Sequence, residues 1–164
     1  MKKCMAASIL VLTMIGLVFA AEIDIEKYPS CTYCGMNRAK FAQSRMLIEY
    51  EDGTAVGVCS LRCAAVDLIN NLDKTPRRIG VGDQTNQKLI DAEKAVWVLG
   101  GNKPGVMTSR AKWAFATSQG AEGFIKEHGG TMTTFEASMN AACEDLYQDT
   151  RMIRERRKMK RTNH

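Results

Sequence analysis

Apolar and polar residues alternate over residues 45–51, a period of two that predicts a β-strand with one buried face, and residues 54–58 are expected to form the return strand. The residues between them, Asp52 and Gly53, are typical of a two-residue hairpin turn, because such turns need a positive φ that glycine adopts without strain. We therefore predict an antiparallel hairpin whose second strand leads directly to Cys59.

The period changes to that of a helix immediately after this hairpin. Ser60 suits the N-cap position, and Pro76 later breaks the helical pattern. Residues 78–82 then have the pattern of a short strand. The expected buried stripe of the helix comprises Leu61, Ala64, Ala65, Leu68, Ile69 and Leu72.

The second half of the chain repeats the same order of elements. Strands are predicted over 94–99, 112–116 and 131–134, and a helix between the last two ends at Gly129-Gly130. The apolar stripe of that helix comprises Ala121, Phe124, Ile125 and His128. We therefore predict an α+β fold of two strand–strand–helix–strand units, followed by a C-terminal helix.

The last predicted helix begins near Phe135 and runs into a strongly basic tail. Its expected buried side comprises Phe135, Met139, Ala142 and Leu146. Residues 151–164 contain seven Arg or Lys and a single acidic residue, a charge of +6, whereas residues 21–150 carry −3. We expect no nucleic-acid partner for the fold itself. The tail is expected either to contact a membrane or an acidic partner or to remain solvated.

Residues 1–20 have the features of a signal peptide: Lys2 and Lys3, an apolar run over 6–19, and a small-x-small pattern at 18–20. The apolar run is too short for a comfortable membrane span. We therefore expect cleavage and export to the periplasm, rather than an uncleaved anchor. No cysteine directly follows the cleavage pattern, so we expect no lipoprotein attachment site.

These patterns divide the chain into four parts. After the signal peptide we expect a first unit over 21–84, which carries a cysteine-rich metal site, and a second unit over 85–145. Residues 146–164 form the basic C-terminal helix or tail.

The cysteines carry the most distinctive spacing in the sequence. Cys4 would leave with the signal peptide. Cys31 and Cys34 flank a two-residue knuckle, and Cys59 and Cys63 lie four residues apart across the predicted helix start. Closure of the hairpin would bring the two pairs together. Four such sulfurs suit copper(I), zinc or an iron–sulfur cluster, and they also suit disulfides.

The remaining cysteine chemistry gives no indication of catalysis. Cys63 lies in the first helical turn, where the helix dipole and unpaired amides favour a thiolate, so we expect a lowered pKa. Cys143 stands alone on the last helix and is interpreted as a small apolar residue. A thioredoxin-like Cys-x-x-Cys opens a helix, whereas this one precedes a hairpin. We expect a protein that is not an enzyme.

Two methionines favour copper over zinc. Met36 follows Cys34 after one glycine, and Met107 follows the predicted loop over 100–105. A thioether beside thiolates is typical of copper(I). Met36 also fits an ordinary core methionine, whereas Met107 has no obvious helical or alternating partner in the sequence. His128 lies on an apolar stripe beside a glycine cap, which indicates a packing or capping role.

Several separate motifs, in the same order, resemble the NosL family of exported copper(I)-binding accessory proteins of nitrous oxide reductase. They are the knuckle from Cys31 to Met36 (CTYCGM), the Asp52-Gly53 turn, Leu89-Ile90-Asp91-Ala92 before Val96-Trp97-Val98, Val106-Met107-Thr108, the run from Lys112 to Ala116 (KWAFA), and His128-Gly129-Gly130. The likeness covers about residues 28–145. The first half also resembles the TRASH and YHS metal-trafficking modules, through Cys34, Cys59 and Cys63.

The resemblance implies copper(I) as the metal and delivery to a client cuproprotein as the function. Cys34 and Met36 match the family's knuckle, and Met107 matches its loop methionine. The chain departs from the family in its second cysteine pair, its basic tail and the lack of a lipid-attachment cysteine. The hypothesis is a periplasmic copper carrier, and the alternative is a structural zinc or disulfide-stapled interaction domain. The candidate ligands are Cys31, Cys34, Met36, Cys59, Cys63 and Met107.

Overall fold

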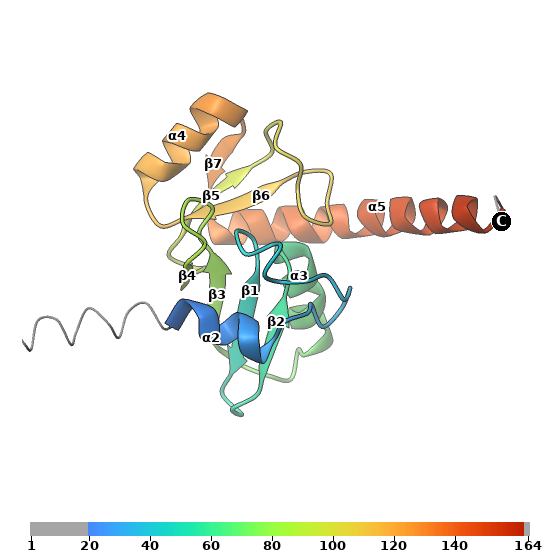
Figure 1. The fold of residues 1–164 in the computed structure, drawn as a ribbon, viewed down its shortest axis with the longest axis horizontal. Coiled ribbons are helices and arrows are strands. Elements are labelled where there is room, and N and C mark those ends of the chain that lie inside the picture. Colours follow the sequence, from blue (N-terminus) through green and yellow to red (C-terminus); the bar gives the residue numbers. More distant parts are fainter. Residues whose placement is uncertain (1–19, 163–164) are drawn as a thin grey trace, which may run out of the picture.

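The computed structural model describes residues 20–162, so the predicted signal peptide lies outside the described residues except for Ala20. Its elements are α2 (Ala20–Lys27), β1 (Met46–Tyr50), β2 (Ala55–Val58), α3 (Leu61–Asn70), β3 (Pro76–Gly82), β4 (Leu89–Asp91), β5 (Val96–Leu99), β6 (Lys112–Phe115), α4 (Ser118–His128), β7 (Thr131–Thr133) and α5 (Phe135–Thr162). The α+β prediction and the strand–strand–helix–strand order of both halves are confirmed (Figure 1).

The first sheet contains the predicted hairpin at one edge. Its strand order is β2-β1-β3-β4, and all neighbours are antiparallel. Met46 pairs with Val58, and the turn is held by Asp52 Oδ1, which accepts a hydrogen bond from the Thr54 amide at 2.8 Å. The fourth strand was not predicted. It pairs Ile90 with Val81, so the first sheet continues into the sequence that follows residue 84.

Helix α3 packs against β1 and β2, but its buried stripe is shorter than predicted. Leu61, Ala64 and Ala65 are buried, whereas Ile69 is 49% exposed and Leu72 is 85% exposed. The reason is the helix end: α3 stops at Asn70, and the Asn71 side chain then donates to the Asp67 carbonyl at 2.8 Å. The prediction that Ile69 and Leu72 are buried was therefore wrong.

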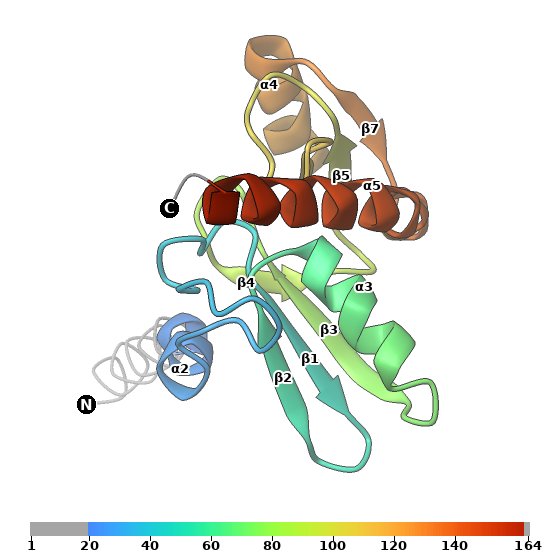
Figure 2. The same cartoon turned by 90° about the vertical axis from the view of Figure 1, so that its right-hand side faces the viewer.

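The second sheet has the order β6-β5-β7 and is covered by α4 (Figures 1 and 2), and its three strands and its helix are those predicted. Gly129 ends α4 with φ of +71°, and its amide donates to the Ile125 carbonyl at 2.8 Å. The two sheets meet where Asp83 bridges to Ala114, beside a 2.8 Å hydrogen bond from the Gln84 amide to the Ala114 carbonyl. The units therefore share main-chain contacts.

Helix α5 lies between the two units and then projects beyond both (Figures 1 and 2). It packs against α3 on one side and β5 on the other. Its buried residues are Phe135, Ser138, Ala141, Ala142 and Asp149, whereas Met139 and Leu146 are half-buried. Neither α5 nor another helix among the described residues has an apolar stretch long enough to cross a membrane.

Cys143 is exposed on α5, so the prediction of a small packed residue was wrong. The buried face of the helix runs through Ala142 and Asp149, and Cys143 is turned away from it. Cys143 is therefore an isolated thiol on the surface and is not part of the cluster of the other four described cysteines.

Candidate metal centre

The first cysteine pair is held by a tight turn of the main chain. The Gly35 amide donates to the Cys31 carbonyl at 2.9 Å, and the Cys31 amide donates to the Met36 carbonyl at 2.8 Å. Gly35 has φ of +72°, a conformation that side-chain-bearing residues rarely adopt. The chain therefore reverses directly after Cys34, as a metal-binding knuckle requires.

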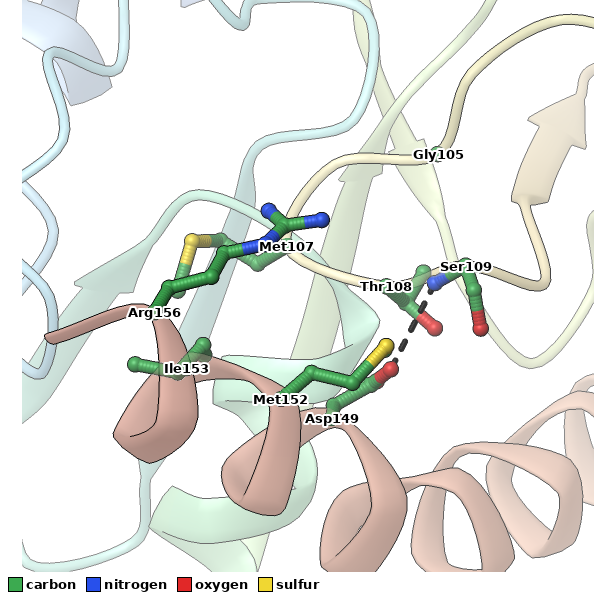
Figure 3. A pocket seen from close by; sticks show the side chains of 8 residues that line it. All are labelled: Gly105, Met107, Thr108, Ser109, Asp149, Met152, Ile153 and Arg156. Carbon is green, nitrogen blue, oxygen red and sulfur yellow. Dashed lines mark hydrogen bonds between the residues drawn. The ribbon is translucent and has the colours of Figure 1, made fainter. Parts of the chain in front are cut away.

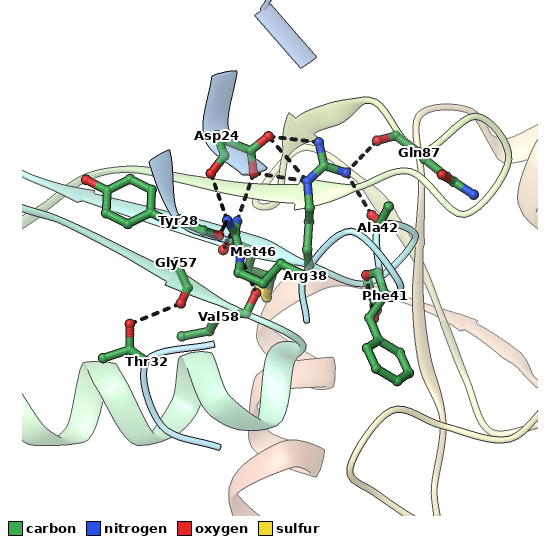
Figure 4. A network of polar contacts seen from close by, with 12 residues as sticks. Asp24, Tyr28, Thr32, Arg38, Phe41, Ala42, Met46, Gly57, Val58 and Gln87 are labelled. Carbon is green, nitrogen blue, oxygen red and sulfur yellow. Dashed lines mark hydrogen bonds and ion pairs between the residues drawn. The ribbon is translucent and has the colours of Figure 1, made fainter. Parts of the chain in front are cut away.

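Main-chain and side-chain contacts fix this knuckle beside the end of β2. The amide and the hydroxyl of Thr32 both donate to the Gly57 carbonyl, each at 3.1 Å (Figure 4). Cys59 lies two residues further along the chain, and Cys63 follows in the first turn of α3. The hairpin thus brings the second cysteine pair to the knuckle, as predicted.

All four sulfurs converge on one point. The Sγ atoms of the four cysteines lie within 4.8 Å of one another. The distance is 3.4 Å from Cys34 to Cys59, 3.8 Å from Cys59 to Cys63, and 3.9 Å from Cys63 to Cys34. Metal–sulfur bonds of about 2.3 Å in a tetrahedron place their sulfurs about 3.8 Å apart. The spacing of the free thiols therefore suits a single soft metal ion.

The cluster is accessible on one side. Cys31, Cys59 and Cys63 are buried, whereas Cys34 is half-buried. Tyr33, its neighbour in the knuckle, is 38% exposed. An incoming ligand from another molecule would therefore meet Cys34 first.

The crowded sulfurs shift each other's proton affinities. Hydrogen bonds from Cys59 and Cys63 hold the pKa of Cys31 well below its ordinary value. The hydrogen bond with Cys31, together with burial, raises the pKa of Cys63 to about 12, and similar causes raise the pKa of Cys59. The expected thiolate at Cys63 was therefore wrong, because the neighbouring sulfurs outweigh the helix terminus. One thiolate forms readily, and the others need a cation to replace their protons.

A buried ionic network links α2 and the chain before β1 to the end of β2, next to Cys59 (Figure 4). Asp24 of α2 pairs with Arg38 at 2.8 Å and with Arg45 at 2.9 Å, and all three side chains are nearly inaccessible to solvent. Arg38 Nε also donates to the Val58 carbonyl at 3.1 Å, immediately before Cys59. Sequence reasoning missed this network, because Asp24, Arg38 and Arg45 are separated along the chain and follow no recognised motif.

A carboxylate on α3 joins the knuckle to the sheet. Tyr33 donates its hydroxyl proton to Asp67 Oδ1 at 2.6 Å, and Tyr50 of β1 donates to Asp67 Oδ2. Burial and the hydrogen bond to Asp67 raise the pKa of Tyr33 to about 12, so the hydroxyl stays protonated as a donor. Asp67 lies one helical turn after Cys63, on the same face. It therefore fixes Cys63 relative to the residues between Cys31 and Cys34.

The two candidate methionines occupy different positions relative to the cysteines. Met36 is half-buried in the knuckle itself. Met107 lies in the loop before β6 and lines a cavity of about 320 Å³ between that loop and α5 (Figure 3). The cavity lining contains no cysteine; it comprises Gly105, Met107, Thr108, Ser109, Asp149, Met152, Ile153 and Arg156. Met107 has φ of +61°, a costly conformation for a residue with a side chain.

The loop that contains Met107 nevertheless lies beside the residues between Cys59 and Cys63. The Ser109 amide donates to Asp149 Oδ1 at 3.4 Å, and Asp149 Oδ2 lies 3.8 Å from Nε of Arg62, the neighbour of Cys63. A small hollow also has lining residues from both segments: Ser60, Leu61, Arg62, Val106, Thr108 and Lys112. The second unit therefore faces the start of α3.

His128 takes part in packing, in agreement with its predicted role. Its ring packs against Phe124 in a tilted arrangement with centroids 4.6 Å apart, and Nδ1 lies 3.2 Å from Asn102 Oδ1. Among the described residues, the sulfur cluster contains no histidine.

Comparison with known proteins places this arrangement in a family. The NosL family model matches residues 22–142. The crystal structure of the copper chaperone NosL from Shewanella denitrificans is similar, with a TM-score of 0.52 and 22% sequence identity over 65% of this chain and 87% of that one. A search of curated proteins finds no significant match. The match of the family model over most of the sequence shows that the chain belongs to the NosL family.

Proposed function

We propose that this protein is a copper(I)-binding accessory protein that delivers the metal to a client cuproprotein. The observation that carries the proposal is the convergence of four free thiols within 4.8 Å in a member of the NosL family. The structural neighbour is a copper chaperone, which agrees with a binding and delivery role and not with catalysis. Nitrous oxide reductase is the client that the family relationship suggests.

The donor set and its accessibility support transfer. Thiolates bind copper(I) strongly, and the ion accepts two or three ligands, so a site need not close around it. We propose Cys31, Cys34, Cys59 and Cys63 as ligands, with the thioethers of Met36 and Met107 as further candidates. Because Cys34 is the half-buried member, a client's ligand would enter on its side.

A structural zinc site is the alternative. Four thiolates in a tetrahedron are typical of zinc, and such sites are usually closed. The accessible sulfur of Cys34 and the adjacent methionine favour copper, since zinc seldom uses thioethers.

Metal competition tests the proposal. Reduced, metal-free protein is titrated anaerobically with copper(I) in the presence of a chromophoric copper(I) chelator, and separately with zinc. We expect one copper(I) ion per chain, bound tightly enough to compete with the chelator, and displacement of zinc when both metals are offered. Uptake of zinc alone would establish the structural alternative.

We propose export through a signal peptide that is cleaved after Ala20. The support is the sequence pattern of residues 1–20, with its basic start, short apolar run and small-x-small ending. The intact mass of the exported protein should correspond to a chain that begins near Ala21. A retained Met1 or an added lipid mass would contradict this.

Removal of one hydroxyl group from the knuckle should weaken copper binding without unfolding the protein. Tyr33→Phe removes the hydrogen bond to Asp67, which orients the knuckle toward α3. Groups that orient metal ligands contribute about tenfold or more to affinity, so we expect a loss of about tenfold. The melting temperature should change little, because Tyr33 is partly exposed.

Tyr50→Phe is the matched control, because it removes the same kind of donor from the same carboxylate. Tyr50 is buried in β1 and is not part of the knuckle. The change should therefore mainly lower the melting temperature, by several degrees. Chelator competition and thermal unfolding measure the two effects. A loss of stability without loss of affinity in Tyr33→Phe would rule out the orienting role.

A further inference from the structure

The outer part of α5 is a feature that the proposed copper site does not use. Asp149 is the last buried residue of the described chain, and the helix continues to Thr162, about 20 Å further at 1.5 Å per residue. Met152, Ile153 and Arg156 still line the cavity of Met107, and the end of the helix beyond them projects from the body of the protein (Figures 1 and 2). It also lies beyond residues 22–142, which the family model matches.

The projecting segment is strongly cationic. Its exposed cations are Arg151, Arg154, Arg156, Arg157, Lys158, Lys160 and Arg161. Within the described chain, Arg151 pairs with Glu155 at 2.9 Å, and the other cations of the segment have no acidic partner within salt-bridge distance. Neighbouring positive charges repel one another, so the segment favours contact with a negatively charged surface.

Four of these cations share one face of the helix. Arg151, Arg154, Lys158 and Arg161 follow one another at intervals of three and four residues, which places them in line along the helix. Tyr147 begins the same line and is 70% exposed. Tyr147, Arg151, Arg154 and Lys158 line one shallow hollow together with Glu155. We refer to Tyr147, Arg151, Arg154, Lys158 and Arg161 as the basic face.

We propose that the basic face binds the surface of a bilayer that contains anionic phospholipids. A regular line of Arg and Lys matches a field of phosphate groups, to which guanidinium groups donate paired hydrogen bonds. An exposed tyrosine at one end suits the headgroup region, where its ring and hydroxyl meet different surroundings. Protein interfaces instead have an apolar, charge-poor core, and this face offers only Tyr147 for such a core.

Vesicle binding by charge-matched variants tests the proposal. The double variant Arg154→Gln/Lys158→Gln removes two charges from the basic face. Arg156→Gln/Lys160→Gln removes the same residue types from the opposite side, where Arg156 lines the cavity of Met107. Vesicles of phosphatidylcholine alone are compared with vesicles that contain about 30% phosphatidylglycerol, at about 0.1 M salt, because salt screens such attraction.

We expect the unchanged protein to bind only the anionic vesicles. Each cation near such a surface contributes about fivefold, so the change on the basic face should weaken binding by about twenty-five-fold, and the opposite change by less than about fivefold. Equal weakening by both variants, or equal binding to both kinds of vesicle, would overturn the proposal. Binding to polyglutamate but not to anionic vesicles would also overturn it, in favour of an acidic protein partner.

Discussion

Replacement of Cys34 or Cys63 by serine should abolish tight copper(I) binding. Each variant removes one sulfur from a cluster in which the two atoms lie 3.9 Å apart. Loss of a group that merely orients a ligand costs about 10–100-fold in metal affinity, so the loss of a ligand itself should exceed about a hundredfold. Competition with a copper(I) chelator under anaerobic conditions measures the effect.

Two further variants test whether the loss of affinity is specific to the cysteine cluster. Met107→Leu should lower the affinity only mildly and leave the fold intact, because Met107 lies in a neighbouring cavity and leucine fills a similar volume. Cys143→Ser should change nothing, because Cys143 is an exposed, isolated thiol among the described residues. If the variants at Cys34 and Cys63 bind copper(I) as tightly as the unchanged protein, the carrier hypothesis is wrong.

The second large effect concerns stability. Asp24→Asn should destabilise the fold by about 3–5 kcal/mol, because it removes the negative charge of a buried carboxylate that pairs with two buried guanidinium groups. Arg38 and Arg45 are 0% and 1% exposed, so water cannot replace the carboxylate. Chemical denaturation of the metal-free protein measures the free energy of unfolding.

Glu155→Gln is the appropriate control for Asp24→Asn. Glu155 also pairs with an arginine, Arg151, at 2.9 Å, but both side chains are more than half exposed. Exposed pairs of this kind contribute less than about 1 kcal/mol, so the control should unfold almost as the unchanged protein does. Similar small losses in both variants would show that the Asp24 network does not stabilise the fold.

The local elements were predictable because their causes lie within a few residues. The hairpin follows from alternation and from Asp52-Gly53, and the convergence of the cysteines follows from the hairpin together with the knuckle. The end of α3 was less predictable. The periodicity of the sequence extends to Leu72, but the Asn71 side chain bonds to the Asp67 carbonyl and the helix ends before it.

The supporting contacts of the site depend on the tertiary structure and leave little trace in the sequence. Tyr33 and Asp67 are 34 residues apart, and nothing in their local sequence pairs them. Asp24 is buried near the start of the described chain, in a stretch that looks like a polar lead-in. The low pKa at Cys31 likewise arises from sulfurs that only folding brings near.

The folded part of the chain extends to Asp149, beyond the residues that the family model matches. The family model ends at residue 142. Asp149 nevertheless accepts a hydrogen bond from the Ser109 amide and pairs with Arg62, which lies beside the cysteine cluster. A chain cut at the end of the family match would lose this carboxylate and leave Arg62 Nε buried without a charged partner among the described residues. A shortened version of this chain should therefore retain the helix through Asp149, because the part of α5 just beyond the family match still contributes contacts to the fold.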